Sequence, residues 1–430
     1  MRWTRYSSFL LVAAGVYHLR RAWSSAITTD EAFTANDFAS LPWLDLFTRY
    51  DANHHILHTI LCKLSLSAFG WNELALRAPS LLAGFVWLYL IHCLAKRLFG
   101  DSPLHFVLCG WLAFHPALLD WFSLARGYSL ALAFMLAAIY ELAGPLPRLT
   151  RASLWLGLSV ASNLVFAVPA TALVLGWTAA RRAWPRLPDL AVPGASVALV
   201  ITIIPLSRSS GSNFYYGSTT LANSLDSLVA IPHFEPLTPL LMIAAPAVLA
   251  AALWFARQDE TLRFFSWSLA LCVLATAAMR AVGVPYPLGR TGVHLVALAI
   301  LCLLQMLSLV RYHWIWAAAL APVLAFLFAV PNGYYPMWRY DSANRAVMER
   351  IAASGVAAPK VAAHFTMVSG LEFYRRMPAF SHIAPLRRTK DASGAQFIVV
   401  RTDDDSGPQP PPGAEPVWRD FTSGIVLYKR

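Results

Sequence analysis

The sequence predicts an all-α polytopic membrane protein, with about eleven transmembrane helices and a small C-terminal α/β domain on the outer face. Three observations support this fold class. Of the 430 residues, 57% are hydrophobic and only 13% are charged. Apolar runs of about twenty residues, the length that crosses roughly 30 Å of hydrocarbon, recur through the first three quarters of the chain. The runs do not alternate polar and apolar residues, so they are typical of helices and not of barrel strands.

The loops between the apolar runs set the topology. We expect spans at residues 6–24, 78–95, 104–122, 128–143, 153–180 (a hairpin of two short helices), 190–206, 237–256, 263–281, 292–310 and 314–330. With the N-terminus in the cytoplasm, every loop assigned to the inside is basic, as the positive-inside rule requires. The basic residues in these loops are Lys96, Arg97, Arg148, Arg151, Arg181, Arg182, Arg186, Arg257, Arg263 and Arg311. The N-terminal segment has no small-residue cleavage motif, so it is expected to be an uncleaved signal anchor.

Residues 54–70 decide this topology. Their apolar run is short and contains three histidines and a lysine, which favours an amphipathic helix on the outer surface. A span at this place would invert every later loop and break the charge pattern. The outer face then holds loops 25–77, 123–127, 207–236 and 282–291 and the tail after residue 331.

Residues 331–430 differ in composition from the rest of the chain. RYDSANRAVMERIAASG has the pattern of an amphipathic helix, and AQFIVV and GIVLYK have that of strands, with the proline-rich loop GPQPPPGAEP between the strands. We therefore divide the chain into a transmembrane domain, residues 1–330, and a soluble α/β domain, residues 331–430, on the outer face.

Net charge and cysteine content exclude two classes of function. The formal charge is +11, but the basic residues lie between the apolar runs and form no patch, so we expect a lipid bilayer and not nucleic acid as the partner. The cysteines lie inside hydrophobic segments without CxxC spacing, so we expect small apolar core residues and neither disulfides nor a metal site. They are Cys62, Cys93, Cys109, Cys272 and Cys302.

An acidic pair, Asp30 and Glu31, follows the first span in the stretch SAITTDEAFTANDF. Thr28 and Glu31 fit the capping box [ST]-x-x-E, so the start of a helix is sufficient to explain the pair. The location of the pair at the membrane surface also favours a catalytic role, because burial there can raise the pKa of a carboxyl group toward the range of a general base. The two interpretations are compatible, and both acids are candidate catalytic residues.

Histidines are concentrated in RYDANHHILH, residues 49–58. His54 and His58 are four residues apart and share a helix face, so with Asp51 they could bind a metal ion. An HxxxH pair without further ligands is a weak signal, and we favour a polar contact from His54 to a phosphate. We assign no metal ligands, and the requirement for a divalent metal ion stays open.

Two arginines on the outer face are candidates for binding a phosphate. Arg126, in SLARGYSLALAF, stands between two long apolar runs, where an arginine is a functional candidate by default. The alternative, an arginine that snorkels from a helix end, is disfavoured because this turn is on the outside. The prolines and glycines of VGVPYPLGRTGVHL form a rigid turn that presents Arg290 beside Tyr286, an arrangement that suits the phosphate of a lipid carrier. An ordinary loop arginine remains the alternative for Arg290.

Several motifs, taken in order along the chain, resemble those of a known family. The acidic pair is followed by NHHIL, FGWNELALRAPSLLAG, LAKRLFG and LARGYSLALAF, and YPLGRTG comes near residues 286–292. Together they resemble the membrane glycosyltransferases of GT-C fold, specifically the bacterial relatives of protein O-mannosyltransferases and of lipid A aminoarabinose transferases. The likeness covers roughly residues 5–180.

The resemblance implies roles for particular residues. The catalytic aspartate of the family, the first acid of its DE pair, corresponds to Asp30. Its histidine corresponds to His54 and its arginine to Arg126. This chain departs from the family pattern beside these residues. Next to His54 it has His55 in place of proline, and near Arg126 it has Leu124 in place of an acid and Gly127 in place of proline.

The resemblance also implies a function. We expect an integral glycosyltransferase of the cell inner membrane that moves a sugar from a dolichyl- or polyprenyl-phosphate donor to an envelope lipid, glycan or protein at the periplasmic face. Asp30 would act as the general base, Glu31 would orient the acceptor or tune Asp30, and Arg126, Arg290 and His54 would bind the donor phosphate. Further candidate substrate contacts are Asp51, His55, Tyr128 and Tyr286.

Two other functions remain open. A transporter or flippase for a lipid-linked sugar would show inverted repeats and ionisable residues at the bilayer midplane, and the sequence shows neither. A non-catalytic membrane scaffold is not excluded by any feature of the sequence. A hydrolytic glycosidase is disfavoured, because adjacent acids cannot flank a glycosidic bond.

Overall fold

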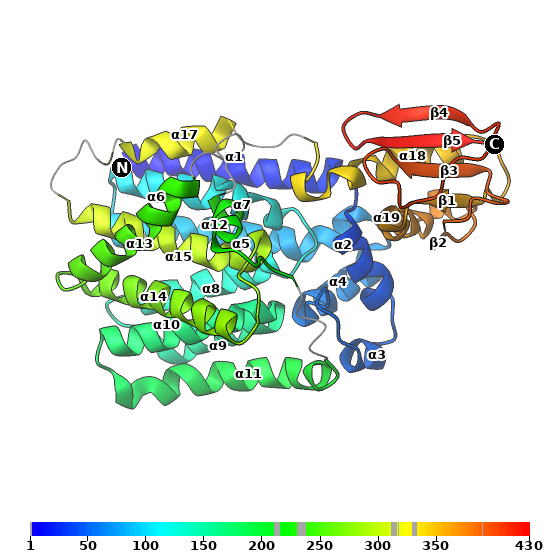
Figure 1. Ribbon diagram of the computed structural model, residues 1–430. Helices are drawn as coiled ribbons and strands as arrows, with labels where there is room; N and C mark the ends of the chain where they lie inside the picture. Colours follow the sequence, from blue (N-terminus) through cyan, green and yellow to red (C-terminus); the bar gives the residue numbers. More distant parts are fainter. Residues whose placement is uncertain are drawn as a thin grey trace.

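In the computed structural model the chain is mostly helical, with a five-stranded sheet at one end (Figure 1). The structure describes residues 2–209, 216–229, 238–310, 316, 318–328, 333–388 and 390–430. The helices of the bundle are α1 (Arg2–Ser24), α5 (Glu73–Phe99), α6 (Pro103–Phe114), α8 (Tyr128–Leu142), α9 (Leu149–Ser162), α10 (Ala167–Ala180), α11 (Leu187–Ser207), α13 (Thr238–Phe255), α14 (Glu260–Ala281), α15 (Val293–Ser308) and α17 (Leu320–Phe328).

Many of these helices are apolar enough for a membrane. In the described part of the chain, four are also long enough to cross one, namely Glu73–Phe99, Trp184–Ser207, Glu260–Ala281 and Gly289–Ser308. Five shorter apolar helices are Ile56–Phe69, Pro103–Phe114, Tyr128–Leu142, Leu164–Ala180 and Met242–Phe255. The count of about eleven spans stays a prediction, and the predicted span 314–330 and loop 207–236 lie partly outside the described residues.

The predicted helical segments are mostly found, with one correction. Residues 153–180 form two helices, as predicted, with the break at Asn163. The segment 104–122, predicted as one span, is not one continuous helix, because α6 ends at Phe114 and is followed by α7 (Pro116–Leu119) and η2 (Asp120–Phe122). Pro116 has no N–H to donate and disfavours the α conformation at His115, which adopts φ −58° and ψ 123°.

Four short helices form in loop 25–77, and in Figure 1 those labelled α2, α3 and α4 lie beside the end of the bundle that is next to the sheet. They are α2 (Thr29–Phe33), the π-helix η1 (Thr34–Ala39), α3 (Trp43–Thr48) and α4 (Ile56–Phe69). The helix predicted at 54–70 is therefore present as α4, while its position on the outer surface stays a prediction. The capping box is also present, because Glu31 N–H donates to the Thr28 hydroxyl at 3.3 Å and Thr28 N–H donates to the Glu31 carboxylate at 3.0 Å.

The C-terminal region is a mixed sheet with helices. Its elements are η8 (Pro336–Ala343), α18 (Asn344–Ala352), β1 (Val361–Ala363), α19 (Phe365–Arg375), β2 (Arg387–Arg388), β3 (Phe397–Arg401), β4 (Glu415–Asp420) and β5 (Ile425–Lys429). The strand order is β2-β1-β3-β5-β4, with β1 parallel to β2 and β3, and β5 antiparallel to β3 and β4. The predicted helix and both predicted strands are confirmed as α18, β3 and β5.

The sheet shares its hydrophobic core with loop 25–77. One cluster of buried side chains joins Ile27, Ala35 and Leu76 to Leu371 and Leu427. Figure 1 shows α19 against α2, and the two helices are in contact. Because burial of apolar surface is the main favourable term in folding, the C-terminal region stabilises the position of α2.

A buried carboxylate of η8 holds the first turn of α2. Asp341 is fully buried and accepts hydrogen bonds from the Thr29 backbone N–H at 2.6 Å and from the Thr29 hydroxyl at 2.9 Å. Asn344 donates to the same carboxylate at 3.0 Å. The N-terminal N–H groups of a helix have no partner within the helix, so Asp341 supplies one from a segment far away in the sequence.

Stability should depend on pH through Asp341. Burial raises its pKa from 3.8 to about 8, although the bonds from Thr29 and Asn344 oppose the shift. The folded protein then holds a proton that the unfolded chain has lost, so the contribution to the free energy of unfolding is full below about pH 4 and is lost as the pH rises to about 8. We expect Tm in detergent to fall less over this range in Asp341→Asn than in the parent protein. The exposed control, Asp405→Asn, should follow the parent, and parallel profiles for all three proteins would contradict the assignment.

Candidate functional site

The two acids of the DE pair lie in different surroundings. Glu31 is fully buried and pairs with the fully buried Arg77 of α5, through Nε–Oε1 and Nη2–Oε2 contacts of 2.7 Å each. Glu31 also accepts from the Thr28 backbone and hydroxyl and from the Ala125 backbone N–H at 2.8 Å. Its oxygens are therefore occupied by protein groups, and a substrate does not reach them in this arrangement.

Asp30 is next to Glu31 but is partly open, with 14% of its side chain exposed. Its Oδ2 forms an ion pair with Arg290 and lies 3.6 Å from Nη2 of Arg126. Three residues predicted for the site thus meet at one carboxylate, although Asp30 and Arg290 are separated by 260 positions. Consecutive helical residues point about 100° apart, which explains how Glu31 is buried while Asp30 faces a cationic site.

Arg126 is almost completely buried, with 1% of its side chain exposed. Its Nη2 donates to the Asn53 side-chain oxygen at 2.7 Å, while Nη1 lies 3.4 Å from the Asp30 carbonyl. Nε has no hydrogen-bond partner among the described residues. Burial lowers the pKa of Arg126, Asp30 opposes this effect and Arg290 adds to it. A second anion near Asp30 would therefore stabilise the charge of Arg126.

Arg290 lies in the short helix η7 (Gly289–Gly292), at the start of α15. The loop before it is fixed by a two-way backbone pairing of Tyr286 with Ser218, at 2.8 Å in both directions. The aromatic neighbour of Arg290 is Tyr216, whose ring centroid lies 4.1 Å from the guanidinium carbon. The Tyr286 ring, which the sequence suggested for this position, instead lies 5.7 Å from the guanidinium carbon of Arg280.

The histidines of residues 49–58 lie around this site and are neutral. His54 stacks on Phe38 with ring centroids 4.3 Å apart, and burial lowers its pKa to about 4. Burial also lowers the pKa of His55 well below its ordinary value, and Arg126 adds to the shift. Nε2 of His54 and Nε2 of His55 are buried with no hydrogen-bond partner in the described part of the chain, whereas Nε2 of His58 lies 3.1 Å from the Ser80 hydroxyl. Nδ1 of His54 lies 3.0 Å from the Arg49 carbonyl oxygen, so Nδ1 carries the proton and Nε2 of the neutral ring can only accept. In this arrangement His54 does not donate a hydrogen bond to a phosphate, so the predicted contact requires the ring to change its protonation.

Two further predicted residues have structural partners here. Tyr128 is buried at the start of α8, with its ring 5.3 Å from that of His55. Asp51 accepts from the Asn53 N–H at 2.8 Å and so shapes the turn that presents Asn53 to Arg126.

Sequence reasoning missed four residues of this site. They are Arg77, Asn53, Tyr216 and Asp341. Arg77 had a signal, because it is an arginine within an otherwise apolar helix and such residues are functional or paired. The other three are ordinary loop or surface types in the sequence and become distinctive only through contacts with distant segments.

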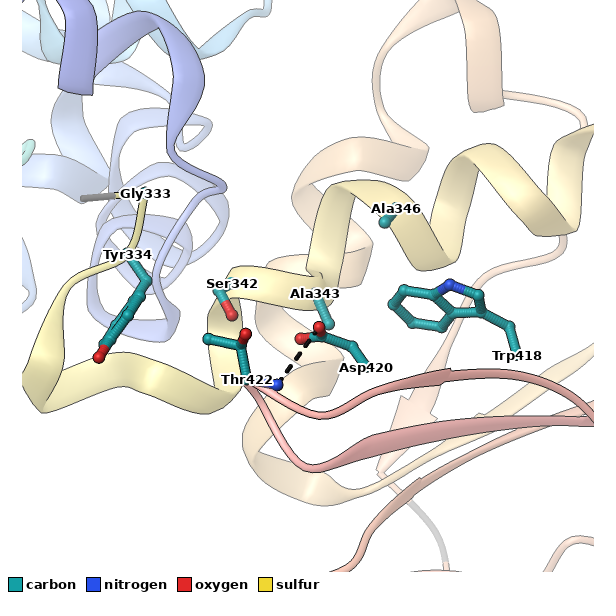
Figure 2. Close-up of a pocket in the computed structure, with 8 residues that line it drawn as sticks. All are labelled: Gly333, Tyr334, Ser342, Ala343, Ala346, Trp418, Asp420 and Thr422. Carbon is teal, nitrogen blue, oxygen red and sulfur yellow. Dashed lines mark hydrogen bonds between the residues drawn. The ribbon is translucent and has the colours of Figure 1, made fainter.

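Neither the group of possible metal ligands nor the cavity of the C-terminal region coincides with Asp30. Among the residues that the structure describes, the group of three possible metal ligands is His92, His105 and Cys109, toward the far end of α5. A cavity of about 280 Å³ lies in the C-terminal region between η8, α18 and the β4–β5 turn. Figure 2 shows Trp418 and Asp420 in its wall, with Asp420 accepting from the Thr422 N–H at 3.4 Å. This carboxylate closes the turn and is separate from the cluster at Asp30.

Comparison with known proteins supports the fold. No family model matches the chain, and no curated protein matches its sequence. The structure is similar to a crystal structure of ArnT from Cupriavidus metallidurans bound to undecaprenyl phosphate, with a TM-score of 0.54 and 15% identity over 98% of this chain and 97% of that chain. For ArnT in the apo state the TM-score is 0.48, with 13% identity and the same coverage.

The chain has a GT-C fold. The likeness to undecaprenyl-phosphate-bound ArnT spans almost the whole chain, so it includes the C-terminal region as well as the bundle. The sequence resemblance is thereby confirmed at the level of fold. Together with the apolar helices, this fold indicates a multi-pass membrane protein.

The Glu31–Arg77 pair should control stability. Arg77→Gln leaves Glu31 buried without its cation, which should cost about 3–5 kcal/mol in the free energy of unfolding. The matched control is Arg151→Gln, because Arg151 pairs with Glu141 at 3.5 Å with 54% of its side chain exposed, and such a pair is worth about 1 kcal/mol or less. Denaturant unfolding in detergent measures both. Equal losses in the two variants would show that the buried pair has no special role.

Proposed function

We propose that this protein is a membrane glycosyltransferase that moves a sugar from a polyprenyl-phosphate donor to an acceptor of the bacterial envelope. The observation that carries the proposal is the position of Asp30, which is held between Arg290 and Arg126 in a chain with a GT-C fold. One carboxylate beside two guanidinium groups suits a reaction in which a proton is removed at one point while negative charge develops on a phosphate nearby.

The arginines bind the donor phosphate in this proposal. A guanidinium group donates in a planar fork that matches the oxygens of a phosphate, and its bonds to an anion are stronger than neutral hydrogen bonds. Nε of Arg126 has no hydrogen-bond partner among the described residues, and 14% of the Arg290 side chain is exposed. Both arginines can therefore still donate to a ligand. The undecaprenyl phosphate bound to ArnT is a ligand of the proposed chemical class.

Binding of the donor also releases the base. In the free protein Asp30 is paired with Arg290, so its carboxylate is engaged. A donor phosphate competes with Asp30 for Arg290, and the freed carboxylate then accepts a proton from the acceptor nucleophile. The nucleophile attacks the anomeric carbon and the polyprenyl phosphate leaves, so that a single displacement inverts the anomeric centre.

Glu31 has a positioning role in this mechanism. Its five hydrogen-bond contacts are all with protein groups, including Arg77 and the Ala125 N–H. It fixes α2, which carries Asp30, and the turn that carries Arg126. We place the site at the periplasmic face of the inner membrane, with the N-terminus in the cytoplasm, because the basic loops then lie inside.

Asp30→Asn tests the base. The variant should lose transfer of sugar from a polyprenyl-phosphate donor, because the amide cannot take the proton. It should bind polyprenyl phosphate at least as tightly as the parent, because Arg290 no longer has a carboxylate as a competitor. Asp37→Asn, a change of the same kind seven residues later, is the control and should keep activity. Transfer is measured as polyprenyl phosphate released from a lipid-linked sugar by protein in detergent with envelope extract as acceptor.

The outcomes of this test separate the three functions. Full activity in Asp30→Asn would contradict the proposed mechanism. Movement of the donor across a vesicle membrane without release of polyprenyl phosphate would indicate a transporter. Neither transfer nor movement in the parent protein would favour a scaffold.

Arg290→Gln tests the phosphate site. Loss of a charged hydrogen bond of about 1.5–3 kcal/mol should weaken the binding of polyprenyl phosphate by roughly tenfold to a hundredfold. Arg280→Gln is the control, because Arg280 lies on the adjacent helix but stacks on Tyr286 and not at Asp30. Binding is measured by fluorescence of a labelled polyprenyl phosphate. An equal effect of the two changes would show a general charge effect in place of a specific site.

A further inference from the structure

Three side chains that can bind metal ions meet at the end of α5 that is remote from Asp30. His92 comes from α5, and His105 and Cys109 come from α6. Their candidate ligand atoms all lie within 4.8 Å of one another. His105 and Cys109 are fully buried, and His92 is partly buried. His92 is fifteen residues after Arg77, so the group lies about 22 Å along α5 from the Glu31–Arg77 pair.

The contacts of His105 determine which nitrogen faces this group. Its Nδ1 lies 2.8 Å from the Gly100 carbonyl oxygen, which can only accept a hydrogen bond. Nδ1 therefore carries the proton, and Nε2 of the neutral ring has a free lone pair. This Nε2 is buried and has no hydrogen-bond partner among the described residues. A histidine with one nitrogen bonded to a carbonyl and the other open is the arrangement that orients metal-binding histidines.

His92 also has a nitrogen without a partner among the described residues, and Cys109 adds a thiol that is not in a disulfide. Nδ1 of His92 is buried without a hydrogen-bond partner in the described part of the chain, and the two imidazole rings have centroids 5.0 Å apart. Cys109 is a free thiol four residues after His105, so the two lie on one face of α6. The Ser7 hydroxyl of α1 is a hydrogen-bond neighbour of this thiol. Leaving buried nitrogens without partners is destabilising, and one bound ion would satisfy them together.

We propose that His92, His105 and Cys109 form a Zn²⁺ site that joins α5 to α6. Two imidazoles and a thiolate are ligands of the type that zinc prefers. Zinc–nitrogen and zinc–sulfur bonds of about 2.1 and 2.3 Å place tetrahedral ligands roughly 3.3–3.7 Å apart, so side-chain rotations that shorten the present separations by about 1 Å are sufficient. Cys109 loses its proton on binding, and a water molecule takes the fourth position.

The site was not predicted from sequence, and it revises the expectation that every cysteine is an apolar core residue. Its ligands come from two helices and are thirteen and four residues apart, so no CxxC or HxxxH spacing marks them. The site is independent of the proposed sugar transfer, because it is remote from Asp30. It should contribute to the stability of the bundle, since an ion that binds only the folded state stabilises that state.

Metal analysis of the full-length protein tests the proposal. The protein is purified in detergent with a tag that contains no histidines, incubated with zinc, passed through a gel-filtration column and analysed by plasma mass spectrometry. We expect about one zinc ion per chain, and a strong loss of zinc in Cys109→Ala and in His105→Gln. Cys93→Ala is the matched control, because Cys93 is next to His92 but outside the group, and it should keep its zinc.

A second measurement does not depend on the folding of one variant. Cobalt added to the metal-free parent protein should give a thiolate-to-cobalt charge-transfer band that persists in Cys93→Ala. A chelator should lower the Tm of the parent and of Cys93→Ala. Absence of stoichiometric metal, copper in place of zinc, a zinc content unchanged by Cys109→Ala, or lack of the cobalt band would each overturn the proposal.

Discussion

The buried pair of Glu31 with Arg77 is the interaction on which the site around Asp30 depends. Moving two charges out of water is costly, and their mutual attraction offsets that cost only where the remaining donors and acceptors are also satisfied. All five N–H groups of Arg77 have partners, since it also donates to the carbonyls of Ala22, Ser25 and Ala26. The pair therefore satisfies carbonyl groups at and just after the C-terminal end of α1 and also holds α2 in place.

The Glu31–Arg77 pair and its hydrogen bonds determine where the candidate catalytic groups lie. Because Glu31 also accepts from the Ala125 N–H, the turn before α8 is held against α2, and Arg126 follows one residue later. Asp30 is fixed on the other side by the bond of Asp341 to Thr29. The cationic site is thus assembled by contacts between segments far apart in the sequence, with the first helical turn of α2 at the centre. The same contacts explain why the sheet and loop 25–77 share one core.

The sequence was sufficient for features that depend on local pattern and insufficient for features that depend on long-range contact. The capping box, α4 and the strands β3 and β5 follow from residue periodicity and local hydrogen bonding, and the division of residues 153–180 into two helices follows from the length of that segment. The strands β1 and β2 have three and two residues, too few to show a period. The predicted topology put Asp30, Arg126 and Arg290 on one face, but it gave no indication that Arg77, Thr28 and Ala125 occupy both carboxylate oxygens of Glu31. The sequence pointed to Tyr286 as the aromatic neighbour of Arg290, but the neighbour is Tyr216. This arrangement depends on the backbone pairing of Tyr286 with Ser218, which no local sequence pattern indicates.

Charge balance explains why one free carboxylate with two arginines suits the proposed reaction better than two free carboxylates. A polyprenyl-phosphate sugar is a phosphodiester with one negative charge, so with Asp30, Arg126 and Arg290 the site is neutral before transfer. As the sugar leaves, the phosphate approaches two negative charges and Asp30 takes a proton, so the site is neutral again. If Glu31 were also free, one more negative charge would oppose the leaving phosphate. Its pairing with Arg77 removes that charge from the reaction and leaves the arginines at Asp30 to the phosphate.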